Sequence, residues 1–277
     1  GINYEALESE EAIGRAMLDE IETAAREKEG DLTVVIVGGR GGQALHRLLG
    51  EKAMTNEIDH LLNRLNIFTQ DALAPIEMDN AFSFVRDFER LLGKAFFAKV
   101  KSFTSMQTDA QDLESGLITY VETLESRSPI DIFFLGLGPE ANAASHLAYI
   151  RPGSGATATD IAGMIPISPN ILEHHITKFK AGGAIFNEAD EAECRNATHI
   201  LTLGPAAILN AKRIVQSIVD ADTAPAKRSS FQRLIEAEIS GDQETRARQL
   251  DENPGLWVRL HDSVRSLILP NLLTDSK

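Results

Sequence analysis

Short apolar runs that end at glycines are the feature that most limits how this chain can fold. Residues 32–37 read Leu-Thr-Val-Val-Ile-Val, and four glycines stand among the next five residues. Residues 131–135 read Asp-Ile-Phe-Phe-Leu, with glycines at 136 and 138. A continuous β-branched or aromatic run of this length is typical of a strand that is buried on both faces, as in parallel sheets. We therefore predict strands over 32–37 and 131–135, each with a glycine loop at its carboxyl end.

Helical periodicity alternates with further short apolar runs along the rest of the chain. Helices are predicted over 5–28, 80–98, 108–126, 205–211 and 225–240, with one more beginning near Ala44. Further strands are predicted over Asn66–Thr69, His199–Leu203 and Arg213–Val219, and near Leu256–Leu260, and 70–79 is predicted as a loop. The alternation predicts an α/β fold: a doubly wound, mostly parallel sheet with helices on both faces, of Rossmann-like type.

The chain shows no internal repeat and no dividing linker, so residues 1–277 are predicted to form a single α/β domain. Residues 151–187 are the least regular part, because prolines and glycines interrupt them repeatedly. We predict that they form a lid-like excursion between strands. Residues 240–254 are polar and charged, which predicts a surface insertion.

Composition narrows the class of function. The chain has 27 Lys or Arg residues against 41 Asp or Glu, a net charge of −14 at pH 7. A chain this acidic is a poor general binder of nucleic acid or anionic membranes, and no apolar run approaches the roughly 20 residues of a membrane span. The single cysteine, Cys194, excludes a disulfide framework and a cysteine-based zinc site. Because the start also lacks a signal-peptide pattern, we expect a cytoplasmic protein.

The first glycine loop is a candidate anion site. In an open α/β sheet, ligands bind outside the carboxyl ends of the strands. Glycines allow a ligand to approach the backbone closely, and the amino end of the following helix favours an anion. We therefore predict phosphate binding by Gly38, Gly39, Arg40, Gly41 and Gly42. A tight turn without a ligand is the alternative.

Two further loops carry groups suited to chemistry or to charge recognition. Asp71 lies just past a predicted strand, where a carboxylate is well placed for general-base work; a helix cap is the alternative. Lys227 stands at the start of a predicted helix, where it could reach a phosphate as a point charge. With Arg228 it could equally form a solvated surface pair.

No cofactor is predicted. The loops at Gly39 and Gly136 both fit the relaxed dinucleotide pattern G-x-G-x-x-A. The acidic residue expected about 20 residues later is not clearly present after either loop. Glu173, His174 and His175 do not predict a metal site, because adjacent side chains diverge and no third ligand is evident. Among the remaining histidines, only His146 is placed for chemistry.

Together these loops resemble the glucosamine-6-phosphate deaminase (isomerase) and 6-phosphogluconolactonase family over roughly residues 10–260. The clearest piece is 131–145, Asp-Ile-Phe-Phe-Leu-Gly-Leu-Gly-Pro-Glu-Ala-Asn-Ala-Ala-Ser, which resembles the family's apolar strand followed by L-G-x-G-x-D-G-H-x-A-S. Residues 37–49 resemble its phosphate loop and helix, and 68–80 the segment built around an Asp-Glu pair. Residues 201–211 resemble the deaminase segment L-T-x-G-x-x-x-L-x-D-A. Lys227 aligns with a lysine that contacts the sugar phosphate in the family.

The sequence departs from the family where its chemistry is concentrated. Glu140 replaces the family Asp, Ala141 the Gly, and Asn142 the His that opens the sugar ring in deaminases and acts as the base in lactonases. An asparagine cannot transfer a proton near neutral pH. Arg40 and Gly41 replace the usual residues of the phosphate loop, and Ala72 replaces the second acid after Asp71.

Three functions follow from the resemblance. In the first, the protein is an isomerase or deaminase of a phosphorylated (amino) sugar. Asp71 would then move the proton between C1 and C2, and Glu140 with His146 would take over ring opening, with Asn142 in the place of the histidine. The second is a 6-phosphogluconolactonase-like hydrolase, and the third is a non-catalytic sugar-phosphate-binding protein. Each implies a phosphorylated sugar as the partner. A homo-oligomer is compatible with all three.

Overall fold

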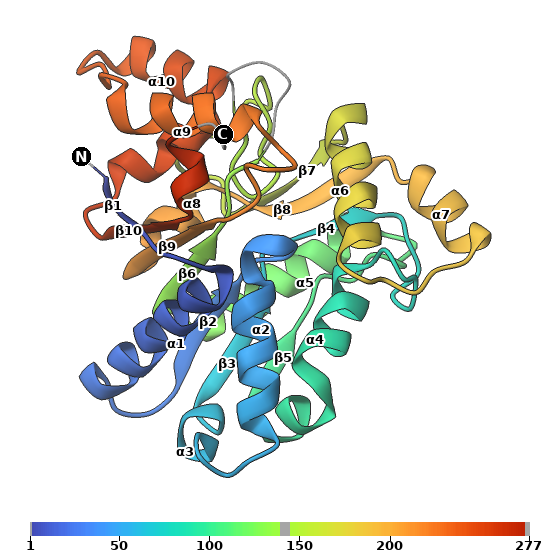
Figure 1. Cartoon of the computed structure of the whole chain (residues 1–277). Helices are drawn as coiled ribbons and strands as arrows, with labels where there is room; N and C mark the ends of the chain where they lie inside the picture. Colours follow the sequence, from blue (N-terminus) through green and yellow to red (C-terminus); the bar gives the residue numbers. More distant parts are fainter. Residues whose placement is uncertain (1, 139–144, 275–277) are drawn as a thin grey trace.

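The larger of two sheets confirms the predicted α/β architecture. The computed structural model describes residues 2–138 and 145–274. Its seven-stranded sheet has the order β1-β10-β9-β6-β2-β3-β5, and every neighbouring pair is parallel (Figure 1). These strands are β1 (Asn3–Ala6), β2 (Leu32–Ile36), β3 (Leu65–Thr69), β5 (Ser102–Thr104), β6 (Ile132–Leu135), β9 (Arg213–Ile218) and β10 (Val264–Ile268).

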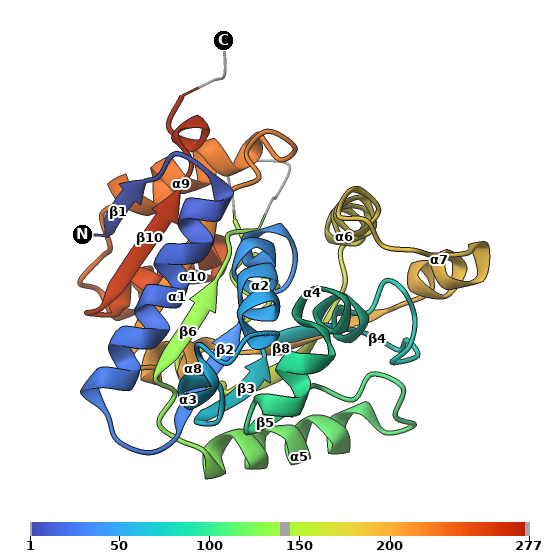
Figure 2. The ribbon, with the colours of Figure 1, turned by 60° about the horizontal axis from the view of Figure 1, so that its bottom comes forward.

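Helices cover both faces of this sheet because successive side chains of its strands point to opposite sides. Val34 and Ile36 of β2 belong to a core formed with α1 (Glu10–Glu27), α2 (Arg40–Ala53) and α4 (Phe84–Lys99). Val35, between them, belongs to a second core. That core includes residues of α5 (Leu113–Ser126), α8 (Pro205–Asn210), α9 (Ala226–Glu236), α10 (Gln243–Glu252) and the 3₁₀ helix η1 (Pro254–Leu260). Figure 2 shows α1 and α2 lying along one side of the strands.

A second sheet, with three antiparallel strands, was not foreseen. It consists of β4 (Asp71–Ala74), β8 (His199–Leu203) and β7 (Ala162–Pro166), in the order β4-β8-β7. The predicted loop over 70–79 was therefore wrong at its start, because only Gln70 separates β3 from β4. The predicted strand His199–Leu203 is confirmed in its bounds, but it pairs in this sheet and not in the larger one.

Two further element predictions needed correction. The first helix begins at Glu10, where the Ser9 side chain accepts a hydrogen bond from the Ala12 N–H, and Asn3–Ala6 is a strand. The apolar run Leu256–Leu260 lies in η1, and the last strand is Val264–Ile268. Proline at the first position of η1 favours a helical turn over a strand there. Short helices α3 (Asp59–Leu62) and η2 (Pro270–Leu272) complete the connections.

The segment 151–187 is more regular than predicted. It contains β7 and the helix α6 (Pro169–Ala181), and α7 (Glu188–Arg195) follows. Figure 2 shows α6 and α7 standing apart from the larger sheet, beyond α4. The polar stretch 240–254 forms α10, whose only buried residue is Leu250. Within residues 2–138 and 145–274, no helix combines the length and the apolar character needed to cross a bilayer.

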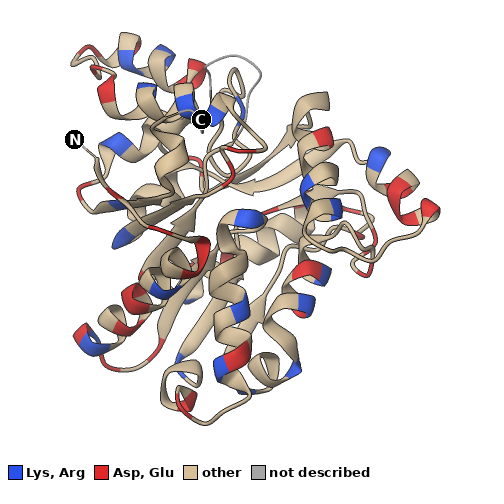
Figure 3. Cartoon of the chain, viewed as in Figure 1, with Lys and Arg blue, Asp and Glu red and all other residues tan. Residues whose placement is uncertain are grey.

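The negative charge is distributed over exposed helices (Figure 3). Helix α1 carries six acidic residues against two arginines, and α7 carries four against one. These helices lie on the outside of the molecule, so the net charge of −14 does not prevent a cationic pocket from forming elsewhere.

Candidate active site

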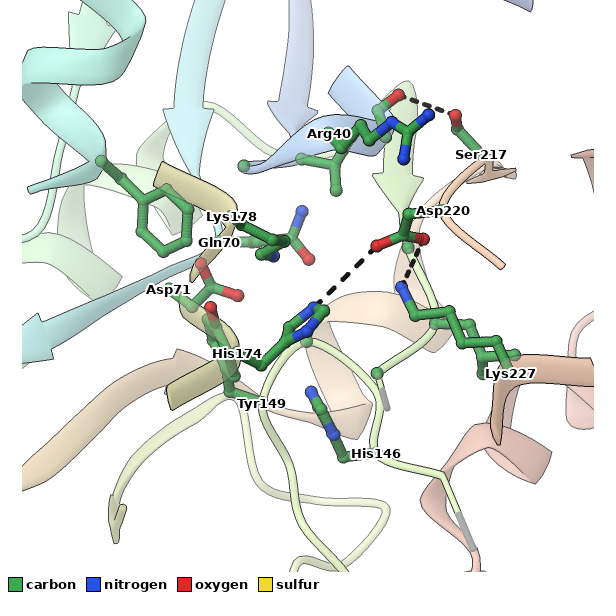
Figure 4. Close-up of a pocket in the computed structure, with 18 residues that line it drawn as sticks. Arg40, Gln70, Asp71, His146, Tyr149, His174, Lys178, Ser217, Asp220 and Lys227 are labelled. Atoms are coloured by element: carbon green, nitrogen blue, oxygen red, sulfur yellow. Dashed lines mark hydrogen bonds and ion pairs between the residues drawn. The ribbon is translucent and has the colours of Figure 1, made fainter. Parts of the chain in front are cut away.

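The candidate site lies at the carboxyl ends of the parallel strands, as expected for an open α/β sheet. Its walls come from the segments after β2, β3, β6 and β9 and from one side of α6 (Figure 4). The polar residues that line it are Arg40, Gln70, Asp71, His146, Tyr149, His174, Lys178, Ser217, Asp220 and Lys227. Four of these, Arg40, Asp71, His146 and Lys227, were predicted from the sequence.

The glycine loop forms the wall at the amino end of α2. Gly38 and Gly41 line the pocket. Gly39 has φ = 73°, and a Cβ there would lie 2.6 Å from Lys178 Nζ, so a side chain would strain the backbone and displace the lysine. Gly42 lies in the first turn of α2, where a Cβ would lie 2.3 Å from the Val37 carbonyl oxygen. The loop therefore brings backbone and cation together without intervening side chains.

Arg40 is held from outside the pocket. Its Nε donates to Glu10 Oε1 at 2.9 Å, and its Nη1 donates to Asp222 Oδ1 at 2.7 Å. The hydrogen bonds from Glu10 and Asp222 raise the pKa of Arg40 above its usual value. Most of the charge of this guanidinium is thus already offset by two carboxylates.

Asp71 is placed by a buried amide. The Gln70 side chain donates from Nε2 to the carbonyl oxygens of Ile36, at 2.9 Å, and Phe134, at 3.0 Å, which ties the ends of β2 and β6 to the start of β4. Asp71 is 8% exposed, and within the described ranges its carboxyl group has no hydrogen-bond donor. Burial raises the pKa of Asp71 to about 7, against the opposing effect of Lys178. A carboxyl group with this pKa can both accept and release a proton near neutral pH.

Helix α6 adds two pocket residues, His174 and Lys178, that were not predicted from the sequence. Ser168 caps the helix by accepting from the Ile171 N–H, and Ile171, Ile176 and Phe179 are buried. His174 and Lys178 are four residues apart, so they project from the same face of the helix, into the pocket. In the sequence, the i, i+4 spacing of these two polar side chains on an amphipathic helix was the feature that could have indicated their shared face.

The neighbouring His175 points elsewhere. Its Nε2 lies 2.7 Å from the Phe82 carbonyl oxygen, and its Nδ1 lies 3.3 Å from the Tyr149 hydroxyl. The two adjacent histidines therefore diverge, as predicted. No cluster of three metal-ligating side chains occurs in the part of the chain that the structure describes.

Lys178 of α6 faces the buried pair of Lys227 and Asp220 in the pocket, and the three charges influence one another. Lys227 is buried and donates from Nζ to Asp220 Oδ1 at 2.6 Å. Burial alone would raise the pKa of Asp220, but Lys227 and Lys178 outweigh it and hold that pKa at about 2. Burial and the nearby charge of Lys227 lower the pKa of Lys178 to about 8. Lys178 has no ion-pair partner within the described residues, so its charge is available to a ligand.

A strained turn closes the pocket from below. Ala148 and Tyr149 have φ values of 45° and 62°, in the left-handed region, and Leu147 and Ile150 pair across them. Such strain persists only where the surroundings enforce it, and it is often found at functional sites. Here it stacks the Tyr149 ring on His146, with ring centroids 5.5 Å apart. Burial lowers the pKa of His146 to about 3. The predicted site residues Glu140 and Asn142 lie outside the described residues.

Comparisons with known proteins agree with this architecture. The family model for glucosamine-6-phosphate isomerases and 6-phosphogluconolactonases matches residues 6–178. No curated protein matches the sequence. Among solved structures, a monomeric glucosamine-6-phosphate deaminase is similar at a TM-score of 0.73 and 19% identity, over 98% of each chain.

Two lactonase structures are also similar. The 6-phosphogluconolactonase of Shewanella baltica has a TM-score of 0.68 and 17% identity, over 97% of each chain. That of Trypanosoma brucei has a TM-score of 0.65 and 15% identity, over 98% of this chain and 97% of its own. At such identities the structural matches establish the fold, whereas the family model establishes descent. The chain belongs to the family of glucosamine-6-phosphate isomerases and 6-phosphogluconolactonases.

Proposed function

We propose that this protein binds a phosphorylated (amino) sugar and catalyses proton transfer between C1 and C2, with Asp71 as the base. The observation that supports this most is the buried carboxyl group of Asp71, whose pKa burial raises to about 7, in the same pocket as Lys178. A general base works best when its pKa lies near the working pH. The phosphate would be held by the glycine loop and Lys178, with Lys227 behind them.

The charges of the pocket support an anionic ligand. Lys227 and Asp220 largely offset each other, and Arg40 is offset by Glu10 and Asp222. Lys178 is left as a positive charge over Gly39, beside the amino end of α2. An anion there would receive both the lysine and the backbone N–H groups of the helix end.

A lactonase is the second candidate, because the family includes such enzymes and two of the solved structures described above are lactonases. In that case a pocket histidine would have to activate water, since Asn142 occupies the position of the family histidine. Sugar-phosphate binding without turnover is the third possibility.

Proton NMR in heavy water tests the proposal. The protein is mixed in turn with glucosamine 6-phosphate, galactosamine 6-phosphate, and fructose 6-phosphate plus ammonium. We expect loss of the C2 proton signal or appearance of the partner sugar, and a loss of roughly 10²–10⁴-fold in rate in Asp71→Asn. Asp79→Asn, an exposed carboxylate eight residues further on, is the matched control and should keep the wild-type rate.

Other outcomes separate the candidates. Line broadening of the sugar without exchange would indicate a binding protein. Faster opening of 6-phosphogluconolactone than in buffer, with no exchange of sugar protons, would indicate a lactonase. We further infer a single α/β domain acting in the cytoplasm, where the buried Cys194 stays reduced; light scattering would decide between a monomer and a homo-oligomer.

A further inference from the structure

His174 projects from α6 into the pocket (Figure 4). Its side chain is 14% exposed, and its Nε2 lies 3.9 Å from Asp220 Oδ2 (Figure 4). That separation is too long for a hydrogen bond, and within the described residues this buried nitrogen has no hydrogen-bond partner. A buried, unpartnered nitrogen that faces a carboxylate across a ligand pocket is placed to exchange a proton with a ligand.

We propose that His174 is a proton donor and acceptor for the oxygens of the bound sugar, that Asp220 orients it, and that the anion of the ligand brings it into use. The inference rests on the proposed sugar-phosphate site and deepens it. It places the imidazole on α6, whereas in the sequence Asn142 replaces the histidine of the family.

The charges around His174 explain why a ligand is needed. Lys178 faces it from α6, Lys227 from α9, Asp220 from the end of β9, and His146 from the segment after β6. Burial, followed by the charges of Lys178 and Lys227, lowers the pKa of His174 to about 2, and Asp220 opposes them only in part. Without a ligand the imidazole is neutral.

A phosphate would change this balance. Its negative charges beside Lys178 and Lys227 would offset the two cations that disfavour the imidazolium. The pKa of His174 then rises, and a proton from solvent binds to it. Asp220, already within 3.9 Å of Nε2, stabilises the charged ring and fixes its orientation.

The proton transfers then balance without any other reactant. Asp71 removes the proton from C2 of the open-chain aldose, the C2–H electron pair forms the C1=C2 bond, and His174 gives its proton to the C1 carbonyl oxygen. In the second half, His174 takes the proton from the C2 hydroxyl as that oxygen becomes a carbonyl, and Asp71 returns its proton to C1. Both groups end in their starting states.

Nitrogen-15 NMR of the histidine side chains tests this without relying on turnover. The wild-type protein is titrated with inorganic phosphate near neutral pH, and His174→Gln assigns the His174 signals. We expect the His174 nitrogens to move from the neutral toward the charged pattern at saturation, which corresponds to a rise of its pKa from about 2 to near 7 once the phosphate offsets the two lysines. His175, next along the helix but bound to the Phe82 carbonyl oxygen, should not respond and is the internal control.

Two results would overturn the proposal. One is a His174 ring that stays neutral while phosphate binds, and the other is the absence of saturable phosphate binding, which would also remove the proposed anion site. If phosphate charges His174 but no sugar phosphate exchanges protons, the proposed reaction fails while the ligand-linked histidine stands.

Turnover supplies the second measurement. His174→Gln should lower kcat by roughly 10²–10⁴-fold with little change in KM. It should also abolish the part of the pH dependence of kcat that comes from titration of the His174 imidazole. His146→Gln, which replaces the other pocket histidine, should retain that pH dependence. An unchanged kcat and pH profile in His174→Gln would overturn the role in proton transfer.

Discussion

The two sides of the pocket differ in whether their charged side chains form ion pairs. On the side of the glycine loop and β9, Arg40 is paired with Glu10 and Asp222, and Lys227 with Asp220. On the side of β4 and α6, neither Asp71 nor Lys178 has an ion-pair partner within the described residues, and their pKa values lie at about 7 and 8. Paired charges hold the walls in place, whereas unpaired ones near neutrality can exchange protons and bind an anion.

The largest expected effect is on stability and comes from the unpaired side. The pKa of Asp71 is raised, so its contribution to stability is present below its unfolded value of about 3.8 and is lost as the pH rises through about 7. Asp71→Asn removes that loss. Above about pH 8 the variant should be more stable than the wild type by about 4 kcal/mol, and near pH 4 the two should be equal.

Urea unfolding at both pH values measures this difference. The rate at which the wild type exchanges the C2 proton of the sugar with solvent should rise with pH through about 7, because Asp71 must be ionised to act as a base. In Lys178→Met the midpoint should move to higher pH, because the lysine lowers the pKa of Asp71. Equal stability of wild type and Asp71→Asn at high pH would show that the carboxyl group is not buried as described.

The paired side should respond in the opposite direction. Asp220→Asn leaves the buried Lys227 without its partner, 2.6 Å away, and should cost about 3 kcal/mol of unfolding free energy. Asp222→Asn is the matched control, because Asp222 is 48% exposed and its ion pair with Arg40 is worth less than about 1 kcal/mol. If both variants lost the same stability, burial of the Lys227–Asp220 pair would not matter.

Ligand affinity should depend on Lys178. Removing a charged hydrogen-bond donor costs about 1.5–3 kcal/mol, so Lys178→Met should weaken binding of a sugar phosphate about 10–100-fold by calorimetry. Lys180→Met controls for helix α6, since Lys180 is 40% exposed and paired with Glu191. A wild-type affinity in Lys178→Met would move the anion site away from this side.

The larger sheet was predictable because apolar residues predominate in its central strands β2 and β6. Strand β2 is buried at every position, and the alternation with helices fixed its class. Strand β1 was missed because all four of its residues are exposed, so it carries no apolar run. Strand β4 was missed because it is short and its identity comes from pairing with β8, well over 100 residues away.

The same distinction holds for the site. Asp71 and Lys227, which line the pocket, could be selected from the sequence because each comes after a predicted strand. His174 and Lys178 were missed because tertiary packing brings α6 over the pocket. The partners of Arg40 are 30 and 182 residues away along the chain, so its pairing was equally beyond the reach of local patterns.

The smallest expected effect comes from replacing Arg40. Arg40 was predicted from the sequence to bind phosphate, yet its guanidinium is already paired with Glu10 at 2.9 Å and Asp222 at 2.7 Å. For Arg40 to bind a phosphate, both contacts would have to be exchanged for new ones, so little net gain is available. Arg40→Met should therefore weaken sugar-phosphate binding by less than about fivefold, below 1 kcal/mol. A loss as large as that of Lys178→Met would mean that Arg40 releases its carboxylates when the ligand arrives, and the glycine-loop side would then share the recognition of the anion.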